Sequence, residues 1–273
     1  MIENSNLIKK VDTKNIIKIE SEGGKNQLEI DLNGGRIREL KLDDKKILGI
    51  FLRADGKEGS THVCCPNFSI EGGEYGLVAH GPCRKMEWKV EDIGTDFIKI
   101  SCILEKGGEG MGSYPTSLKI VQIFFLGNYF EQKVRVENTG DHEALVNVAI
   151  HNYWNTPEGW ENVKWNGKTV ADLIKKDTFI NGGIREENEI EIPGLGKILL
   201  KQNGLSNARF WAASNNGIYD LNYCCMEPAI GGEGYFGSEE SMVKLGEAKE
   251  VSQIILGVRD RSQFEPLLIN TLF

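Results

Sequence analysis

The sequence has no long apolar run and very little proline. Only 7 of its 273 residues are proline, and no stretch approaches the roughly 18 consecutive apolar residues of a membrane-spanning helix. Residues 1–6 do not combine a basic segment with an apolar one, as a secretion signal does. We therefore expect no membrane partner and a cytoplasmic location.

Positive charge is also in deficit. Lysine and arginine number 32 against 40 aspartate and glutamate residues, which gives a net charge of −8. No basic run is long enough to follow a phosphate backbone, so nucleic acid is not an expected partner. The six cysteines form neither a dense disulfide framework nor a Cys-x-x-Cys metal motif, and we expect reduced, mostly buried thiols. They are Cys64, Cys65, Cys83, Cys102, Cys224 and Cys225.

Glycine and alternating apolar patterns are abundant instead. The 32 glycines can supply the positive φ angles that tight turns between short strands need. Polar and apolar residues alternate in several segments bounded by turn residues, which is typical of strands with one buried face. The predicted strands are residues 27–32, 37–42, 97–103, 118–125, 130–136 and 144–150, with hairpin turns at 126–128 and 138–141 and a short helix at 170–176. No linker or repeat interrupts them, so we expect one all-β domain over residues 1–273, a large antiparallel β-sandwich.

Two of the four histidines stand out as candidates for chemistry. His80 opens the segment HGPCR and His151 opens HNYWN, each at the end of an apolar stretch. Imidazole exchanges protons near neutral pH and aromatic rings stack on sugars, so these segments indicate the wall of a binding pocket. The alternative is a core histidine satisfied by the backbone. His142 lies in a turn and is expected to be solvated, while a metal site built from His62 and the next two cysteines is not favoured.

Glu227 is a single carboxylate in an apolar segment, residues 223–228. Such a carboxylate is either paired with a cation or has its pKa raised by desolvation, and both states suit a functional site. The alternative is an exposed glutamate on an edge strand. Pro228 favours that alternative, because proline cannot donate a hydrogen bond to a neighbouring strand.

Taken in order, these motifs resemble the aldose 1-epimerase, or galactose mutarotase-like, superfamily. Its members carry His-Gly-x-x-Arg followed by Trp, then His-x-Tyr-Phe, then a late Glu-Pro. The glycine pair at 34–35 also resembles the pair between the first strands of the superfamily. The likeness extends from about residue 27 to residue 258 with order and spacing kept. The residues that match are His80, Gly81, Arg84, Trp88, His151, Tyr153, Glu227 and Pro228.

The resemblance implies a galactose mutarotase-like supersandwich with an open polar cleft for a small-molecule sugar. Glu227 would remove the proton of the anomeric hydroxyl while His151 protonates the ring oxygen, and rotation about C1–C2 followed by reclosure would give the other anomer. His80 would hold a hydroxyl or the ring oxygen. Neither a metal nor an organic cofactor is implied. The further substrate contacts expected are Arg84, Asn67, Asn188 and Trp154.

The sequence also departs from the pattern. Members that act on hexose 6-phosphates carry Gly-Gly-Ile-Pro before the first histidine and a further arginine, whereas residues 61–66 here are THVCCP, which weakens a phosphosugar assignment. Those members also place an aspartate between the second histidine and the glutamate. The best match is Asn188 or Glu187. Asp172 and Asp177 are less favoured alternatives, because each is expected to be an exposed loop residue. A non-catalytic carbohydrate-binding protein, or another sugar isomerase or lyase reaction on this fold, therefore stays an alternative.

Overall fold

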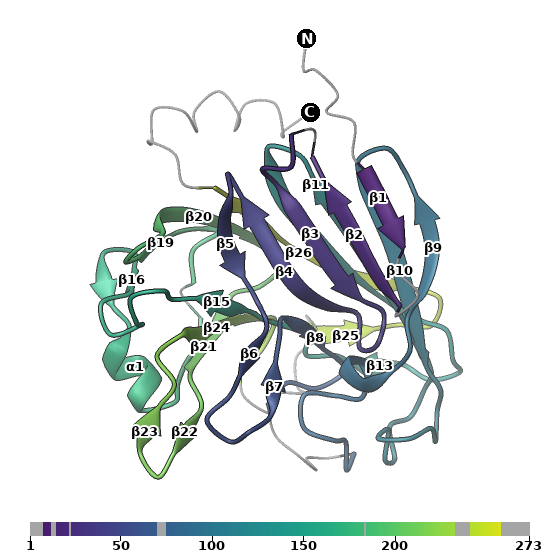
Figure 1. Cartoon of the computed structure of the whole chain (residues 1–273). Helices are drawn as coiled ribbons and strands as arrows, with labels where there is room; N and C mark the ends of the chain where they lie inside the picture. The colour runs from purple at the N-terminus through teal and green to yellow at the C-terminus, as the bar shows by residue number, and fades with distance from the viewer. Residues whose placement is uncertain are drawn as a thin grey trace.

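The computed structural model describes residues 8–11, 15–21, 23–69, 75–182, 184–232 and 241–257. These residues form an all-β structure with two large antiparallel sheets, as predicted (Figure 1). Neither helical segment in this part of the chain has the length or apolar character needed to cross a bilayer. The helical segments are η1 (Cys83–Lys85) and α1 (Ala171–Lys175), and α1 falls within the predicted short helix.

The first large sheet has eleven strands among the described residues, and its central strands carry the candidate site. Its main path runs β1, β2, β3, β4, β5, β15, β24, β14 and β8, while β21 pairs with both β24 and β18. The strands are β1 (Ile8–Val11), β2 (Ile16–Glu20), β3 (Gln27–Asp31), β4 (Arg36–Leu42), β5 (Lys45–Leu48), β8 (His62–Cys64), β14 (Ala149–His151), β15 (Tyr153–Asn155), β18 (Thr178–Ile180), β21 (Asn207–Trp211) and β24 (Tyr223–Ala229).

The second large sheet has nine strands in the described part of the chain. Its order is β17, β16, β19, β20, β26, β12, β11, β10 and β9. The strands are β9 (Lys89–Ile93), β10 (Phe97–Leu104), β11 (Leu118–Leu126), β12 (Tyr129–Asn138), β16 (Lys164–Trp165), β17 (Lys168–Thr169), β19 (Glu187–Ile192), β20 (Gly196–Asn203) and β26 (Ala248–Leu256). Three short pairs complete the fold: β6 (Phe51–Leu52) with β7 (Glu58–Gly59), β13 (Ala144–Leu145) with β25 (Met242–Val243), and β22 (Ser214–Asn215) with β23 (Ile218–Tyr219).

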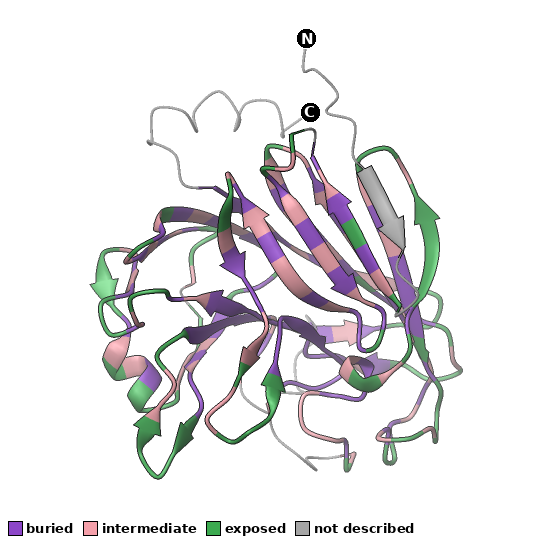
Figure 2. Ribbon diagram, in the orientation of Figure 1, coloured by how far each residue is buried: buried purple, intermediate pink, exposed green. Residues whose placement is uncertain are grey.

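Five of the six predicted strands appear as β3, β4, β10, β11 and β12, and buried residues alternate with less buried ones along them (Figure 2). The sixth, at 144–150, is divided into β13 and β14. The hairpin predicted at 138–141 is wrong, because β13 pairs with β25 rather than returning beside β12. The Asn138 amide explains the departure, since it donates hydrogen bonds to the carbonyls of His142 (2.7 Å) and Val243 (3.0 Å) and so fixes the chain in a different turn.

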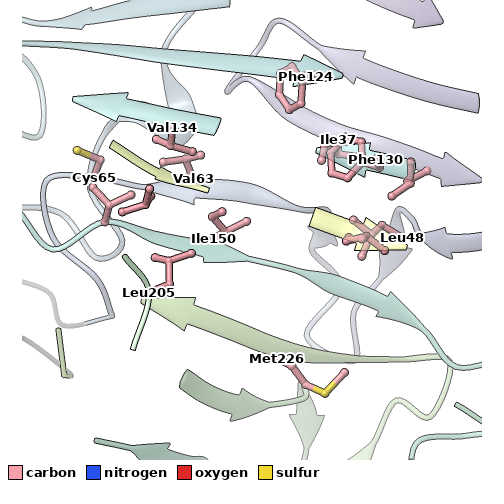
Figure 3. Close-up of a cluster of buried hydrophobic side chains, with 14 of the residues drawn as sticks. Ile37, Leu48, Val63, Cys65, Phe124, Phe130, Val134, Ile150, Leu205 and Met226 are labelled. Atoms are coloured by element: carbon pink, nitrogen blue, oxygen red, sulfur yellow. The ribbon is translucent and has the colours of Figure 1, made fainter. Parts of the chain in front are cut away.

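The main core lies between the two large sheets. Ile37, Val63 and Ile150 from the eleven-stranded sheet pack in one cluster with Phe124 and Val134 from the nine-stranded sheet (Figure 3). All five side chains are at most 1% exposed. Truncation of such a residue to alanine costs about 2–5 kcal/mol of stability, so this layer anchors β8 and β14 from behind.

A buried chain of amides also crosses this core. The side chain of Gln132 donates to that of Gln122 (2.7 Å), Gln253 donates to Gln132 (2.9 Å), and Asn152 donates to Gln253 (2.8 Å). Each amide thereby satisfies polar atoms that would be costly to bury alone. Because Asn152 lies between β14 and β15, the network fixes the backbone next to His151.

Candidate functional site

The candidate site is a row of side chains across four adjacent strands, β8, β14, β24 and β21. His62 pairs with His151, and Arg209 pairs with Glu227. Ala149 pairs with Ala229 in the same antiparallel register, which places His151 opposite Glu227. Paired residues on neighbouring strands project from the same face of a sheet. Since Val63 and Ile150 point into the main core, the row lies on the other face of the sheet.

His151 and Glu227 form the centre of the row. His151 Nδ1 lies 3.1 Å from Glu227 Oε2, and the two side chains are 6% and 1% exposed. The angles are not those of a hydrogen bond, and in the described part of the chain neither His151 ring nitrogen nor Glu227 Oε2 has another partner. Burial raises the pKa of Glu227 to about 8. Burial, and then the neighbouring histidines, lower the pKa of His151 well below its usual value, so both groups favour their neutral forms.

His80 reaches this pair from the loop before η1. Its ring centroid lies 5.2 Å from that of His151, and its Nδ1 is 3.4 Å from Cys64 Sγ. Burial, followed by the charge of Arg84, lowers the pKa of His80 to about 3. The His80-Gly81 step has positive φ at both residues, and a Cβ on Gly81 would overlap the Cys65 carbonyl. The glycine of this motif is therefore required to bring the histidine to the sheet.

Asn67 and Arg84 hold the backbone around His80. The Asn67 amide donates to the carbonyl of Val78 (3.0 Å), and Arg84 Nη2 donates to the carbonyl of Ala79 (3.0 Å). Arg84 Nε is buried without a hydrogen-bond partner among the described residues. In the structure both side chains thus support the histidine loop, and Arg84 retains a donor for a ligand.

His62 is a member of the cluster that the sequence interpretation left out. Its ring centroid lies 4.7 Å from that of His151 and 6.3 Å from that of His80. Its Nδ1–H donates to the Ser60 carbonyl (2.8 Å), and burial lowers its pKa well below the usual value. In the sequence, His62 and Cys64 are two positions apart on one strand, so their side chains project to the same face of the sheet. That this is also the face of His151 becomes evident only from the pairing of β8 with β14.

Cationic and aromatic residues missing from the sequence prediction border the row. Arg209 forms a two-point ion pair with Asp177, with distances of 2.7 Å from Nε and 2.6 Å from Nη2. The Arg53 guanidinium lies 4.9 Å from the centroid of the Trp211 ring, which itself lies 6.1 Å from that of His151. These side chains place donors and an aromatic ring beside His151 and Glu227, as is usual in small-molecule binding sites.

Comparison with known proteins identifies the fold and gives a family match to part of the chain. The family model described as aldose 1-epimerase matches residues 53–178, a segment that includes His62, His80 and His151. Solved structures match nearly the whole chain. The fold is galactose mutarotase-like. The resemblance drawn from the sequence motifs is thereby confirmed.

Three solved structures illustrate the likeness to the galactose mutarotase-like fold. The Slr1438 protein of Synechocystis sp. PCC 6803 has a TM-score of 0.72 at 14% identity, covering 91% of this chain and 97% of its own. A galactose mutarotase related enzyme of Lactobacillus acidophilus has a TM-score of 0.69 at 15% identity, with 93% and 97% covered. A galactose mutarotase-like protein of Lactobacillus casei ATCC 334 has 0.69 at 11%, with 92% and 99% covered. At these identities the likeness establishes the fold alone, and no curated protein matches the sequence significantly.

Two residues expected to contact substrate lie elsewhere in this mutarotase-like fold. The Trp154 side chain is fully buried in the main core, and its Nε1 donates to the Met226 carbonyl (3.4 Å). Asn188 lies on β19 in the nine-stranded sheet, where its amide donates to the Arg185 carbonyl (2.7 Å) and to Gln202 (3.0 Å). The prediction for these two is corrected: their polar atoms stabilise the fold.

The acidic helper and the edge-strand alternative are also clarified. Glu187 is exposed on β19, and Asp172 is exposed in α1, whereas exposed Asp177 pairs with Arg209 in the row. Asp177 thus lies near the site. The alternative of Glu227 on an edge strand is wrong, because β24 lies between β21 and the strands β14 and β15. Pro228 pairs with Ala208 of β21, while on its other side β24 pairs with β14 only at Ala149 and Ala229.

A surface cavity of about 440 Å³ adjoins this region. It shares Arg53 with the border of the row but does not include the histidines. Its wall carries three side-chain amides and one carboxylate, which can form hydrogen bonds with hydroxyls. The lining residues are Leu52, Arg53, Ala54, Asn215, Asn216, Ile218, Tyr219, Asp220 and Asn222.

Proposed function

We propose that this protein is an aldose 1-epimerase that interconverts the anomers of an aldose or a modified sugar. The observation that carries the proposal is the buried pair of His151 and Glu227, with 3.1 Å between Nδ1 and Oε2. Ring opening needs an acid and a base at two oxygens bonded to one carbon, so the two groups must lie close together. The match to the aldose 1-epimerase family over residues 53–178 supports the same reaction.

In the proposed reaction, ionised Glu227 accepts the proton of the anomeric hydroxyl. Protonated His151 donates its proton to the ring oxygen, and the C1–O5 bond breaks as the C1 carbonyl forms. After rotation about C1–C2, His151 accepts the proton of the C5 hydroxyl while Glu227 returns its own to the carbonyl oxygen. The pair carries one proton before and after each half-reaction, so its net charge stays constant in a site with little water.

Neighbouring residues supply position rather than chemistry. His80, 5.2 Å from His151 between ring centroids, would bond to a sugar hydroxyl. Arg84 has a buried Nε that can donate to another. The Trp211 ring stands edge-on to His151 at an interplanar angle of 89°, and its face can stack on the apolar side of a pyranose.

Anomer exchange measured by NMR saturation transfer over a panel of aldoses tests the proposal. We expect catalysed exchange for at least one sugar, with kcat reduced by about 100-fold or more in Glu227→Gln and His151→Gln, because each removes one proton-transfer group. Glu189→Gln is the matched control, since Glu189 lies on β19 and pairs with exposed Lys197. Sugar binding by calorimetry without any exchange would instead select the carbohydrate-binding alternative.

A further inference from the structure

Three histidines converge at one point of the site, which is more than proton transfer requires. The ring centroids of His62, His80 and His151 are separated by 4.7, 5.2 and 6.3 Å. Zinc lies about 2.0–2.1 Å from a ligating imidazole nitrogen and hence roughly 3.2 Å from the ring centroid. Two rings bound to one tetrahedral ion, at an angle of about 109°, would then have centroids about 5.2 Å apart. The two separations that involve His151 are close to this value, whereas His62 and His80 would have to approach each other by about 1 Å.

The ring nitrogens are also in the state that metal binding requires. His62 donates its Nδ1–H to the Ser60 carbonyl at 2.8 Å, which leaves the lone pair of Nε2 directed away from that bond. This arrangement, in which one nitrogen is fixed by a carbonyl, is the usual support for a metal-binding histidine. In the described part of the chain, His62 Nε2 and both nitrogens of His151 are buried without a hydrogen-bond partner. Buried nitrogens left in this way indicate a ligand.

A carboxylate is available as the fourth ligand. The ligand atoms of His80, His151 and Glu227 all lie within 4.8 Å of one another. His62 belongs to a second such group, with Cys64 and His151, so His151 is the member that the two groups share. Glu227 is preferred to Cys64 as the fourth ligand because its Oε2 lies 3.1 Å from His151 Nδ1 and is buried without a hydrogen-bond partner among the described residues.

We propose that this cluster binds one divalent transition metal ion, with zinc the best match to three imidazoles and one carboxylate. Its ligands are His62, His80, His151 and Glu227. The ion would occupy both members of the acid–base pair, so it excludes the sugar from that pair. Zinc is therefore a competitive inhibitor of the epimerase; this second statement rests on the proposed function, while metal binding does not.

The surrounding charges set the strength of this site. Arg209 is neutralised by Asp177, but Arg84 and Arg36 have no ion pair in the described part of the chain. Two unpaired guanidinium groups repel a dication, so we expect a micromolar rather than a nanomolar affinity.

Metal binding is tested on the purified full chain after treatment with a chelator. Isothermal titration with zinc should show one equivalent bound, and cobalt should give the absorption bands of a four-coordinate site. His62→Gln and His80→Gln should each weaken zinc binding by at least about tenfold. His142→Gln is the matched control, because His142 is exposed and pairs only with Asp141 among the described residues. Thermal unfolding of each variant identifies any that has lost its fold.

The outcomes separate the two proposals. Absence of stoichiometric zinc binding, or equal weakening by His142→Gln, would overturn the metal site and leave the epimerase proposal untouched. If the protein shows no anomer exchange, the titrations still decide metal binding. If it is active, zinc should raise the apparent KM, and the inhibition constant should rise at least about tenfold in folded His62→Gln. Zinc binding without inhibition would place the ion elsewhere and refute the assignment.

Discussion

The pH dependence of kcat/KM tests how His151 and Glu227 share their proton. The proposed ring opening needs that proton on His151 at the start and transfers one to Glu227 as the sugar opens. Burial raises the pKa of Glu227 to about 8 and lowers that of His151 well below 6.5. At neutral pH the singly protonated pair therefore holds its proton on Glu227, and the reactive form is a minor tautomer of the same pair.

The size of this effect follows from the two pKa values. Even against the ordinary histidine value of 6.5, a pKa of about 8 for Glu227 places the reactive tautomer about 30-fold below the resting one, or about 2 kcal/mol. Both tautomers hold one proton, so their ratio does not change with pH. We expect kcat/KM to be flat through neutral pH and to fall tenfold per pH unit above about 8, where the pair loses its only proton.

Saturation-transfer NMR at a series of pH values measures this profile, with protein-free samples at each pH to subtract spontaneous mutarotation. The result that would refute the reasoning is a rate that rises through pH 8. Such a rise would mean that ionised Glu227 works with neutral His151, and His151 could not then be the acid. Glu189→Gln should keep the profile of the parent protein, because its carboxylate lies in the other sheet.

Three further results are expected. Because the pKa of Glu227 is raised, its ionisation destabilises the folded parent protein progressively as the pH rises from about 4.5 to about 8. The unfolding free energy of Glu227→Gln, measured by urea denaturation, should therefore increase relative to that of the parent by up to about 5 kcal/mol between these two pH values. An equal difference at both pH values would contradict this. Asp177→Asn removes a negative charge that raises the pKa of Glu227, and it also removes the ion-pair partner of Arg209. The fall of kcat/KM at alkaline pH should therefore begin at a lower pH. An unchanged profile would exclude an effect of Asp177 on the pKa of Glu227. Gly81→Ala should lower the unfolding free energy, measured by urea denaturation, by at least about 2 kcal/mol, because Gly81 has a φ of +71° and a Cβ there would overlap the Cys65 carbonyl. Gly56→Ala is the control and should lower it less, because Gly56 has a similar φ of +76° but no atom within 4 Å of the added Cβ.

The sequence was sufficient for the elements whose signals are local. Alternation along 27–32 or 118–125 predicted β3 and β11, because the period of two arises within each strand. The same rule would have excluded Trp154 from the site: His151 and Tyr153 project to one face of the sheet, so the residue after Tyr153 projects to the other, into the core.

The composition of the site could not be predicted, because it depends on which strands become neighbours. His62 and Arg209 are 147 positions apart by their residue numbers, and only the order β8, β14, β24 and β21 places them in one row. Motif resemblance identified His151 and Glu227, since these were already matched in order. Position between two motifs did not separate Asn188 and Glu187 from Asp177, because chain order alone does not show that β19 lies in the other sheet while Asp177 pairs with Arg209.

Burial explains both the chemistry of the pair and the direction from which a sugar can reach it. On one side of the row, Phe68 packs over Ala149 and Ala229, and Phe68 is fully buried. On the other side of the row lie Trp211 and Arg53. The Arg53 guanidinium lies over the Trp211 ring, and Arg53 also lines the surface cavity of about 440 Å³. The centroid of the Trp211 ring lies 4.9 Å from the Arg53 guanidinium and 6.1 Å from the ring centroid of His151. A sugar that entered there would meet the amide and guanidinium donors first and the neutral pair of His151 and Glu227 last. Its hydroxyl groups would then take the place of water around Glu227, where the proposed reaction needs an ionised carboxylate.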